Sequence, residues 1–450
     1  MPLQSYRTHI KTTFSIAYPV MLSQLGHILV GVADSMMVGA LGAEPLAAVS
    51  LANSLVSLGL MFGIGVSIAI TPLVAAADGG DTTHDQSQIF RHGLVINIIG
   101  GFVLAGLLIA SASALPWLDQ PPRVEELTTP YLIIVSLSML PFMVFQTFRQ
   151  YAEGLSFTRT AMVITLSANG LNVLLNYLLI YGYAGFPAMG LNGAGLATLI
   201  ARGAMAGAMA YYVVRSSWFR WVPVQLRSLQ RTLVRKMLKI GVPTGFQYIF
   251  EVGMFSFASI MMGWLGAQSL AAHQIALNLA AVSYMVATGL AAAATVRIGN
   301  QLGKRDMPNL RRVGWSALAM SAVLMSVSAG IFLLFNRWLP TLYIDEAPVV
   351  NIAASLLVIA AFFQLSDGIQ AVGLGILRGM ADVKIPTLIT LVSYWGIGLP
   401  IAYVLAFPVG WGGTGIWIGL LTSLTVAAAW LVWRFRRLST RSSSADIAAA

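Results

Sequence analysis

Apolar stretches long enough to cross a lipid bilayer recur from one end of this chain to the other. A membrane-spanning helix needs roughly 20 mostly apolar residues, and twelve such stretches can be marked along the 450 residues. Only 9% of the residues are charged, against about 25% in a soluble globular protein. So few charges cannot cover a water-facing surface. We therefore predict an all-α polytopic membrane protein with twelve transmembrane helices.

The predicted spans form two groups of six. Those of the first half are residues 12–37, 46–76, 90–114, 128–152, 160–183 and 190–214. Those of the second half are residues 236–264, 271–300, 312–334, 350–376, 387–407 and 412–434. The connections are short, apart from a basic segment between the two groups that we interpret as an interfacial linker at about 215–235.

The distribution of lysine and arginine predicts the orientation in the membrane. With twelve spans, 23 of the 26 Lys and Arg residues fall on the side that holds both termini. Two of them, Arg123 and Arg337, fall on the other side, and Arg202 falls within a span. Because cytoplasmic loops carry the excess of Lys and Arg, we expect both termini in the cytoplasm. The net charge of +10 is then mainly an orientation signal, and no nucleic-acid partner is needed.

The two halves of the chain repeat each other. The string LGA at 41–43 recurs at 265–267, and LAA at 46–48 recurs at 270–272, an offset of 224 residues. The same offset relates Pro19 to Pro243, Ala52 to Ala276, Gly65 to Gly289 and Thr71 to Thr295. Each copy has an even number of spans, so both enter from the same side, as parallel repeats about an axis along the membrane normal do. We predict two six-helix lobes, residues 1–224 and 225–450, related by pseudo-twofold symmetry.

Three carboxylates, Asp34, Glu251 and Asp367, fall within the predicted spans. A charge at the bilayer centre costs about 2.5–3.5 kcal/mol on insertion scales, so it is retained where it faces a cavity, a partner or an ion. Structural pairing and, for Asp34, a place near the helix end are the alternatives to a binding role. Arg202 is the single cation within a span and a possible cavity residue.

Amide side chains accompany these acids. Asn172 and Asn176 lie four residues apart in the fifth span, as do Gln274 and Asn278 in the eighth, so each pair shares one helix face. Amide and carboxylate oxygens together suit a small cation. Hydrogen bonding between helices, common in membrane bundles, is the alternative that the sequence leaves open.

Enzyme chemistry finds no support in the sequence. There is no cysteine, and no Walker loop, dinucleotide fingerprint or zinc-ligand spacing. No two of the five histidines stand four residues apart, and we interpret His27 and His273 as packed or hydrogen-bonded. We therefore expect no catalytic residue, structural metal or cofactor. With no ATP site, uphill transport would have to be driven by an ion gradient.

Three stretches resemble the MATE family of multidrug and toxic compound extrusion transporters, most closely its bacterial NorM-type branch. They are Gly31–Leu60 around Asp34, Gly245–Asn278 around Glu251 with the string LGAQSLAAHQIALN, and Gln364–Thr387 around Asp367. The likeness extends over almost the whole chain. It implies two lobes around a V-shaped cavity and export of amphipathic, cationic drugs driven by cation influx across the bacterial inner membrane.

The resemblance also implies roles for particular residues. Glu251 and Asp367 match the second-lobe acids that bind the cation, and Asp34 matches the first-lobe acid, with Asn172, Asn176 and Thr198 as its partners. Some relatives carry a tyrosine one helical turn before the last acid, where this chain has Phe363.

We expect Na⁺ as the coupling ion, with H⁺ as the alternative, and a monomer in the lipid bilayer. Within the same superfamily, a flippase for lipids or lipid-linked oligosaccharides is the rival function.

Overall fold

The computed structural model describes residues 5–118, 120–217 and 229–440, and all regular structure within them is helical. The first half of the chain contains α1 (Tyr6–Gly39), α2 (Ala43–Ser67), α3 (Ile70–Gly79), α4 (Thr83–Ser111), the 3₁₀ helix η1 (Ala112–Leu118), α5 (Pro122–Leu137), α6 (Met139–Gly154), α7 (Thr158–Tyr181) and α8 (Gly190–Arg215). Residues 218–228, the middle of the predicted linker, lie outside the described residues.

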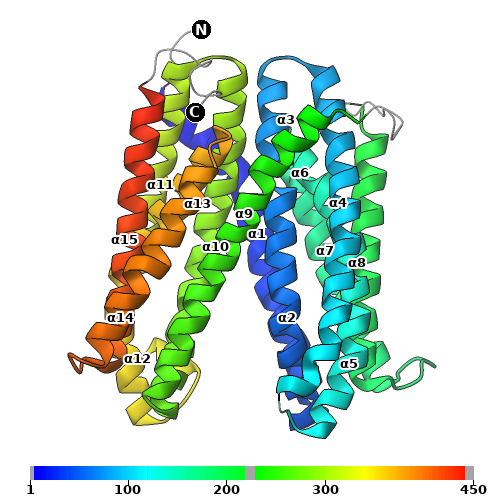
Figure 1. Cartoon of the computed structure of the whole chain (residues 1–450), viewed down its shortest axis with the longest axis vertical. Coiled ribbons are helices and arrows are strands. Elements are labelled where there is room, and N and C mark those ends of the chain that lie inside the picture. Colours follow the sequence, from blue (N-terminus) through cyan, green and yellow to red (C-terminus); the bar gives the residue numbers. More distant parts are fainter. Residues whose placement is uncertain (1–4, 119, 218–228, 441–450) are drawn as a thin grey trace. The chain divides into compact units, whose positions relative to one another are not determined.

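The second half begins with two long helices, α9 (Arg231–Trp264) and α10 (Ala267–Gly303). It continues with α11 (Met307–Leu334), the 3₁₀ helix η3 (Leu339–Leu342), α12 (Ala347–Gly379), α13 (Lys384–Leu391), the π-helical turn η4 (Val392–Gly398), α14 (Leu399–Ala406) and α15 (Gly412–Ser439). Some consecutive helices, such as α2 and α3 or α5 and α6, follow each other with only a short break and form one long segment (Figure 1). Counted in this way, the described chain has twelve long helical segments, which confirms the twelve predicted helices.

Eleven of these segments are long and apolar enough to cross a membrane. The remaining segment is α9, which is 34 residues long. Gln247 and Glu251 lie near its middle and lower its mean hydropathy. One of the residues that make α9 less apolar than the other segments is therefore Glu251, an acid predicted to have a functional role.

The chain divides into two compact units whose boundaries differ from the predicted lobes 1–224 and 225–450. Unit 2 comprises residues 22–245, and unit 1 comprises residues 1–21 together with 246–450. Each boundary falls inside a long helix, after residue 21 in α1 and after residue 245 in α9. These two positions are again 224 residues apart, and each follows an equivalent proline, Pro19 or Pro243, by two residues.

Equivalent close contacts hold these helix beginnings within the two units. In unit 2, a Cβ atom on Gly65 of α2 would lie 2.8 Å from the backbone carbon of Thr244 in α9. In unit 1, a Cβ atom on Gly289 of α10 would lie 2.9 Å from the backbone nitrogen of Met21 in α1. Small residues at such positions let membrane helices approach closely. The repeat in the sequence is thus also a repeat of contacts.

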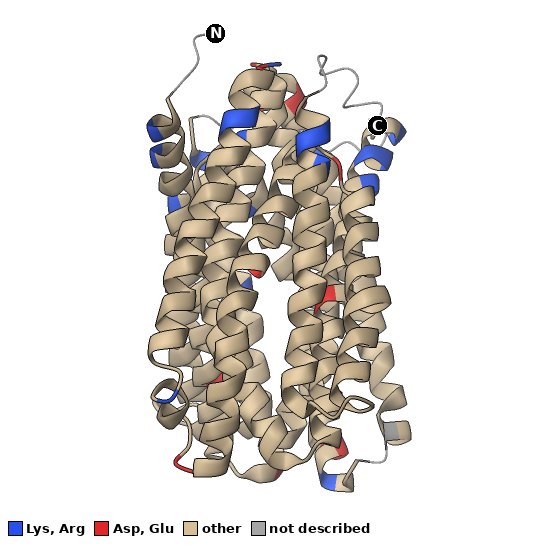
Figure 2. Cartoon of the chain, turned by 90° about the vertical axis from the view of Figure 1, so that its left-hand side faces the viewer, with Lys and Arg blue, Asp and Glu red and all other residues tan. Residues whose placement is uncertain are grey.

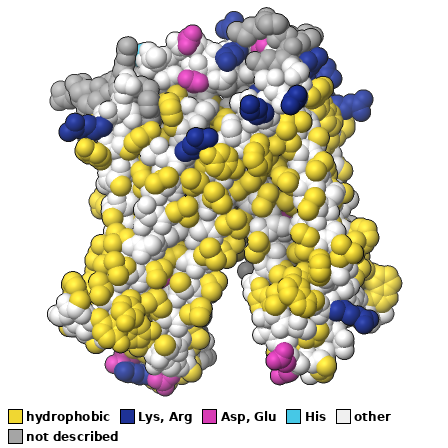
Figure 3. Space-filling model, turned by 180° about the vertical axis from the view of Figure 1, so that it is seen from behind, with side chains coloured by type: hydrophobic (Ala, Val, Ile, Leu, Met, Phe, Trp, Pro, Cys, Tyr) yellow, Lys and Arg dark blue, Asp and Glu magenta, His cyan; other side chains and the backbone are white. Residues whose placement is uncertain are grey.

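The surface of each unit fits a lipid environment. Apolar side chains cover most of the height of the helices (Figure 3). In unit 1, Lys and Arg gather at the end where α1 begins and α15 ends (Figure 2). Large exposed aromatics such as Trp338 and Trp411 lie near the turns at the opposite end, where membrane proteins concentrate aromatic side chains.

Candidate functional site

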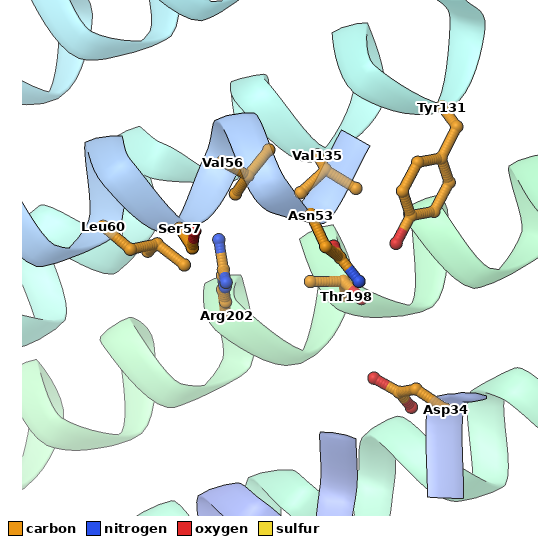
Figure 4. Close-up of a pocket in the computed structure, with 9 residues that line it drawn as sticks. All are labelled: Asp34, Asn53, Val56, Ser57, Leu60, Tyr131, Val135, Thr198 and Arg202. Carbon is orange, nitrogen blue, oxygen red and sulfur yellow. The ribbon is translucent and has the colours of Figure 1, made fainter. Parts of the chain in front are cut away.

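A cavity of about 190 Å³ lies inside unit 2 and contains the first of the predicted acids. Its lining comes from α1, α2, α5 and α8. Figure 4 shows these side chains turned toward a common space. The lining residues are Asp34, Asn53, Val56, Ser57, Leu60, Tyr131, Val135, Thr198 and Arg202. The cavity thus combines one carboxylate and one guanidinium with neutral hydrogen-bonding groups and an apolar wall.

Asp34 is fixed by the amide pair of α7. Asn176 donates a hydrogen bond from Nδ2 to Oδ1 of Asp34 at 2.5 Å, and the same nitrogen lies 3.2 Å from Oδ1 of Asn172. Both asparagines are buried, and Oδ1 of Asn176 has no hydrogen-bond partner. The structure therefore brings Asp34, Asn172 and Asn176 together, with Thr198 on the same cavity wall.

Arg202 faces the same cavity but makes no ion pair of 4.0 Å or less within the described residues. Its Nη1 donates to Oγ of Ser138 at 2.7 Å, and its guanidinium carbon lies 5.1 Å from the centre of the Phe142 ring. Ser138 occupies the break between α5 and α6. The guanidinium is therefore held at a helix break, by a hydroxyl and an aromatic face.

The other two acids are both buried in unit 1. Glu251 of α9 and Asp367 of α12 are 6% and 4% exposed, and they lie close enough for their charges to interact. Tyr284 of α10 donates its hydroxyl to Oε1 of Glu251 at 2.5 Å, and Oε2 has no partner. No described residue donates a hydrogen bond to Asp367. Two buried carboxylates thus share a region with unused acceptor capacity.

A second tyrosine reaches this acid pair from the π-helical turn η4. Tyr394 is fully buried and lies within electrostatic range of both Glu251 and Asp367. Gln370, one turn after Asp367 on α12, donates from Nε2 to the Tyr394 hydroxyl at 2.6 Å, and its Oε1 has no partner. π-helical turns are frequent at functional sites. Unpaired amide, carboxylate and hydroxyl oxygens are the ligands that a hard cation prefers.

The position that is tyrosine in some relatives is apolar here. The ring of Phe363 is 2% exposed and packs against Phe255 and Trp417, with centroid distances of 6.2 and 5.5 Å. The hydroxyl groups near the acids come from Tyr284 and Tyr394 instead, on two other helical segments. The loss of one hydroxyl at residue 363 therefore does not remove hydroxyl groups from the site.

Gln274 and Asn278 lie on the exposed side of α10, and the supporting role expected for them stays a prediction. Both side chains are exposed in unit 1 and make no hydrogen bond to Glu251 or Asp367. The reason is the rotation of α10, whose buried face carries Ala272, Ala276, Ala280 and Ser283. The shared helix face was predicted correctly, but it is not the face that packs toward Glu251.

His273 has a structural role. Trp417 donates its indole N–H to Nδ1 of His273 at 3.1 Å, and Nε2 lies 3.0 Å from Oγ of Ser259. Because the indole is only a donor, Nδ1 must be the acceptor, and the ring proton sits on Nε2. Both ring nitrogens are thereby engaged, and the side chain is unavailable as an ion ligand.

Several residues of the two sites escaped the sequence analysis. They are neutral polar side chains within spans, namely Asn53, Ser57 and Tyr131 in unit 2 and Tyr284, Gln370 and Tyr394 in unit 1. A search for every polar side chain in the spans would have found them. It could not have separated them from the many serines and threonines that bond to their own helix backbone.

Comparison with known proteins identifies the family. The MatE family model matches residues 19–178 and 243–404. The two matches begin 224 residues apart, at the two equivalent prolines, so the repeat seen in the sequence is also the repeat of the family. Together they cover more than half of the chain.

Similar proteins from bacteria extend over the full length. A probable multidrug resistance protein NorM of Rhizobium meliloti (strain 1021) is 35% identical over 451 residues, which cover 99% of this chain and 97% of that protein. The multidrug resistance protein NorM of Photobacterium profundum is 31% identical over 458 residues, which cover 99% of this chain and 99% of that protein.

Solved structures of MATE transporters share the fold. A crystal structure of a variant of the Vibrio cholerae MATE transporter VcmN superposes with a TM-score of 0.89 at 19% identity, covering 97% of this chain and 98% of that one. A MATE protein in complex with MaL6 gives a TM-score of 0.88 at 20% identity, covering 96% and 98%. The chain belongs to the MATE family, in its NorM-type branch, and is a multi-pass membrane protein that acts as a multidrug efflux transporter and not as an enzyme.

Proposed function

We propose that this protein is a secondary active exporter that exchanges amphipathic organic cations for Na⁺, with H⁺ as the alternative coupling ion. It works as a monomer in the bacterial inner membrane, with both termini in the cytoplasm. The basic residues where α1 begins and α15 ends support this orientation, because such residues favour the cytoplasmic side.

The observation that carries the proposal is the acid pair of unit 1. Arg378, which lies over the Tyr248 ring at 5.7 Å, is the cation whose charge reaches Glu251. When both carboxyl groups are ionised, the one nearby guanidinium leaves one negative charge to be balanced. A buried charge needs a partner, and a monovalent cation would supply it. We assign the coupling-ion site to Glu251 and Asp367.

The cavity around Asp34 in unit 2 is the candidate site for the exported drug. Its carboxylate attracts a cation, and Val56, Leu60 and Val135 provide apolar surface for an amphipathic molecule. Coupling requires that the ion and the drug favour different conformations, because a ligand shifts an equilibrium only by its differential affinity for the two states. Binding of the ion at the acid pair would favour the state that releases the drug outside.

Sodium is the preferred coupling ion because Glu251 and the nearby Gln370 each have an unpaired buried oxygen. Oε2 of Glu251 and Oε1 of Gln370 are buried without hydrogen-bond donors, and Na⁺ would use them as ligands. A proton needs only a carboxyl group that gains and loses it. The flippase alternative fits less well, because a pyrophosphate group calls for several cationic side chains and Arg202 is the one cation that lines the cavity of unit 2 among the described residues.

The test is dye efflux from drug-sensitive bacteria that express the full chain. Cells loaded with ethidium receive a pulse of Na⁺ at constant pH or, separately, a pulse of acid without Na⁺. We expect the Na⁺ pulse to accelerate efflux. Acceleration by acid alone would identify H⁺ as the coupling ion, and no response to either pulse would refute coupled export.

Two variants connect the coupling to the acid pair. Glu251→Gln and Asp367→Asn should each abolish the response to Na⁺ while membrane expression stays normal. Asp345→Asn is the matched control, since Asp345 is exposed between η3 and α12 of the same unit. Retained coupling in both acid variants would overturn the assignment of the ion site.

A further inference from the structure

The guanidinium of Arg202 has hydrogen-bonding capacity that the protein leaves unused. A guanidinium has five N–H donors, and within the described part of the chain one hydrogen bond is made, from Nη1 to Oγ of Ser138 at 2.7 Å. The Ser138 hydroxyl donates its own proton to the carbonyl oxygen of Val135, so it meets Arg202 with a lone pair. The Phe142 ring lies against the guanidinium at 5.1 Å. The remaining N–H donors are therefore available to a ligand in the cavity.

Arg202 and Asp34 line the same cavity without pairing with each other. Figure 4 shows them at separate places on the cavity wall, Asp34 on α1 and Arg202 on α8. These two described side chains form no ion pair of 4.0 Å or less. Val56 and Leu60 add apolar surface to the same wall. Each charge is therefore available to a different group of one bound amphipathic molecule.

The charges of the cavity suit a molecule that carries both signs. When Asp34 and Arg202 are both ionised, their charges cancel. A simple cation pairs with Asp34 and leaves the guanidinium without a counter-ion, and an unpaired charge in the membrane interior is costly. A zwitterion supplies a partner to each of the two side chains. A carboxylate also matches the guanidinium in shape, because its two oxygens accept parallel N–H bonds from the planar fork.

We propose that Arg202 is a specificity-determining residue that binds the carboxylate of zwitterionic substrates. These are amphipathic molecules in which an apolar body separates a cationic group from a carboxylate. The cationic group lies at Asp34 and the carboxylate at Arg202, with the apolar body against the apolar part of the cavity wall. One arginine suffices for a single carboxylate, whereas a pyrophosphate calls for several cations. This inference rests on the proposed role of Asp34 as the drug-binding acid.

The test compares two probes that differ in one charge. Triphenylphosphonium with a para-carboxybenzyl group is a zwitterion at neutral pH, and its methyl ester is a permanent cation of almost the same size. Titration calorimetry gives the Kd of each probe for the purified full-length protein at the same pH and salt concentration. We expect the wild type to bind the zwitterion roughly tenfold more tightly than the ester, the scale of a hydrogen bond between charged groups. Equal or weaker binding of the zwitterion would overturn the proposal.

Variants of Arg202 attribute the preference to this side chain. Arg202→Gln removes the charge, so the zwitterion and the ester should bind equally well, whereas a merely structural role would weaken both probes alike and keep the ratio of their Kd values. Arg202→Lys keeps the charge without the fork and should restore part of the preference. Arg311→Gln, at an exposed arginine of α11, is the control and should not alter the ratio. A wild-type ratio in Arg202→Gln or, if that variant does not fold, in Arg202→Lys would overturn the proposal.

Asp34→Asn separates this inference from the proposed function. It removes the partner of the phosphonium group that both probes share, so both should bind more weakly. Wild-type affinity for both probes in Asp34→Asn would remove Asp34 from drug binding and refute the proposed drug site together with this inference. Loss of affinity for both probes in Asp34→Asn, combined with equal binding of the two by the wild type, would leave the drug site in place and refute only the role of Arg202.

Discussion

Asn176 donates a hydrogen bond of 2.5 Å to Asp34, which lies 142 positions earlier in the chain. A hydrogen bond to a charged group contributes about 1.5–3 kcal/mol, so the amide fixes the orientation of the carboxylate in the cavity. We expect Asn176→Ala to raise the KM for export of a cationic dye by roughly tenfold or more, with normal expression.

Asn169→Ala is the matched control for Asn176→Ala. Asn169 lies on the same helix, and its buried Nδ2 has no hydrogen-bond partner. Its loss should leave the KM within a factor of about two, as a deleted group without a bond contributes little. Equal KM values for the two variants would contradict the role of the Asn176 amide.

The hydroxyl of Tyr284 is the only hydrogen-bond donor to Glu251 among the described residues. Tyr284→Phe leaves a buried carboxylate without a donor, which costs about 1–3 kcal/mol. We expect a lower thermal unfolding midpoint in Na⁺-free detergent solution. Tyr403→Phe, at an exposed tyrosine of α14, should unfold like the wild type. An unchanged midpoint in Tyr284→Phe would show that the hydroxyl does not stabilise Glu251.

Arg297 of α10 holds the first part of α1 in unit 1. Its Nη1 donates to the carbonyl oxygen of His9 at 2.6 Å and to Oγ of Thr13 at 2.9 Å, and Nη2 lies 2.9 Å from Nδ1 of His9. Arg297→Met should therefore destabilise the protein by about 2–3 kcal/mol or more, measured by thermal unfolding.

A thiol reporter would show where the loss of Arg297 acts. The chain has no cysteine, so Ile16→Cys introduces a single thiol at a buried position of α1. Its labelling by a maleimide should accelerate in the Arg297→Met background and stay slow with Arg311→Met. Slow labelling in both backgrounds would mean that other contacts suffice to hold this helix segment.

The equivalent glycines Gly65 and Gly289 should tolerate no side chain. A methyl group at either position meets the backbone of the neighbouring helix within 3 Å, and overpacking of this kind costs about 1–3 kcal/mol. Gly65→Ala and Gly289→Ala should therefore both lower the unfolding midpoint. Gly207→Ala in α8, where nothing lies within 4 Å of the added methyl, should leave it unchanged or raise it. Equal midpoints for all three would contradict the close helix approach.

The fold was largely predictable because a helix that crosses a bilayer must be long and apolar and seldom contains charged side chains. The twelve helices follow from that requirement, although α9 falls short on hydropathy through Gln247 and Glu251. The predicted division at residue 224 follows the repeat in the sequence. The sequence does not predict that the compact units divide inside α1 and α9. The place of this division depends on which helices pack together.

The acids of the candidate sites were predictable because buried charge is rare in membranes. The neighbours of each acid were predictable only in part. Asn172 and Asn176 lie on the face of α7 that meets Asp34, whereas Gln274 and Asn278 lie on the exposed face of α10. Both pairs have the same spacing, and only the rotation of each helix in the bundle decides which pair faces an acid.

The division within α1 and α9 has a consequence for the history of the chain. Each unit is completed by the first turns of a helix whose remainder belongs to the other unit, and the two division points are equivalent in the repeat. A six-helix precursor with this arrangement could not have been complete as a single copy. A pair of such copies meets this requirement by exchanging the beginnings of their first helices.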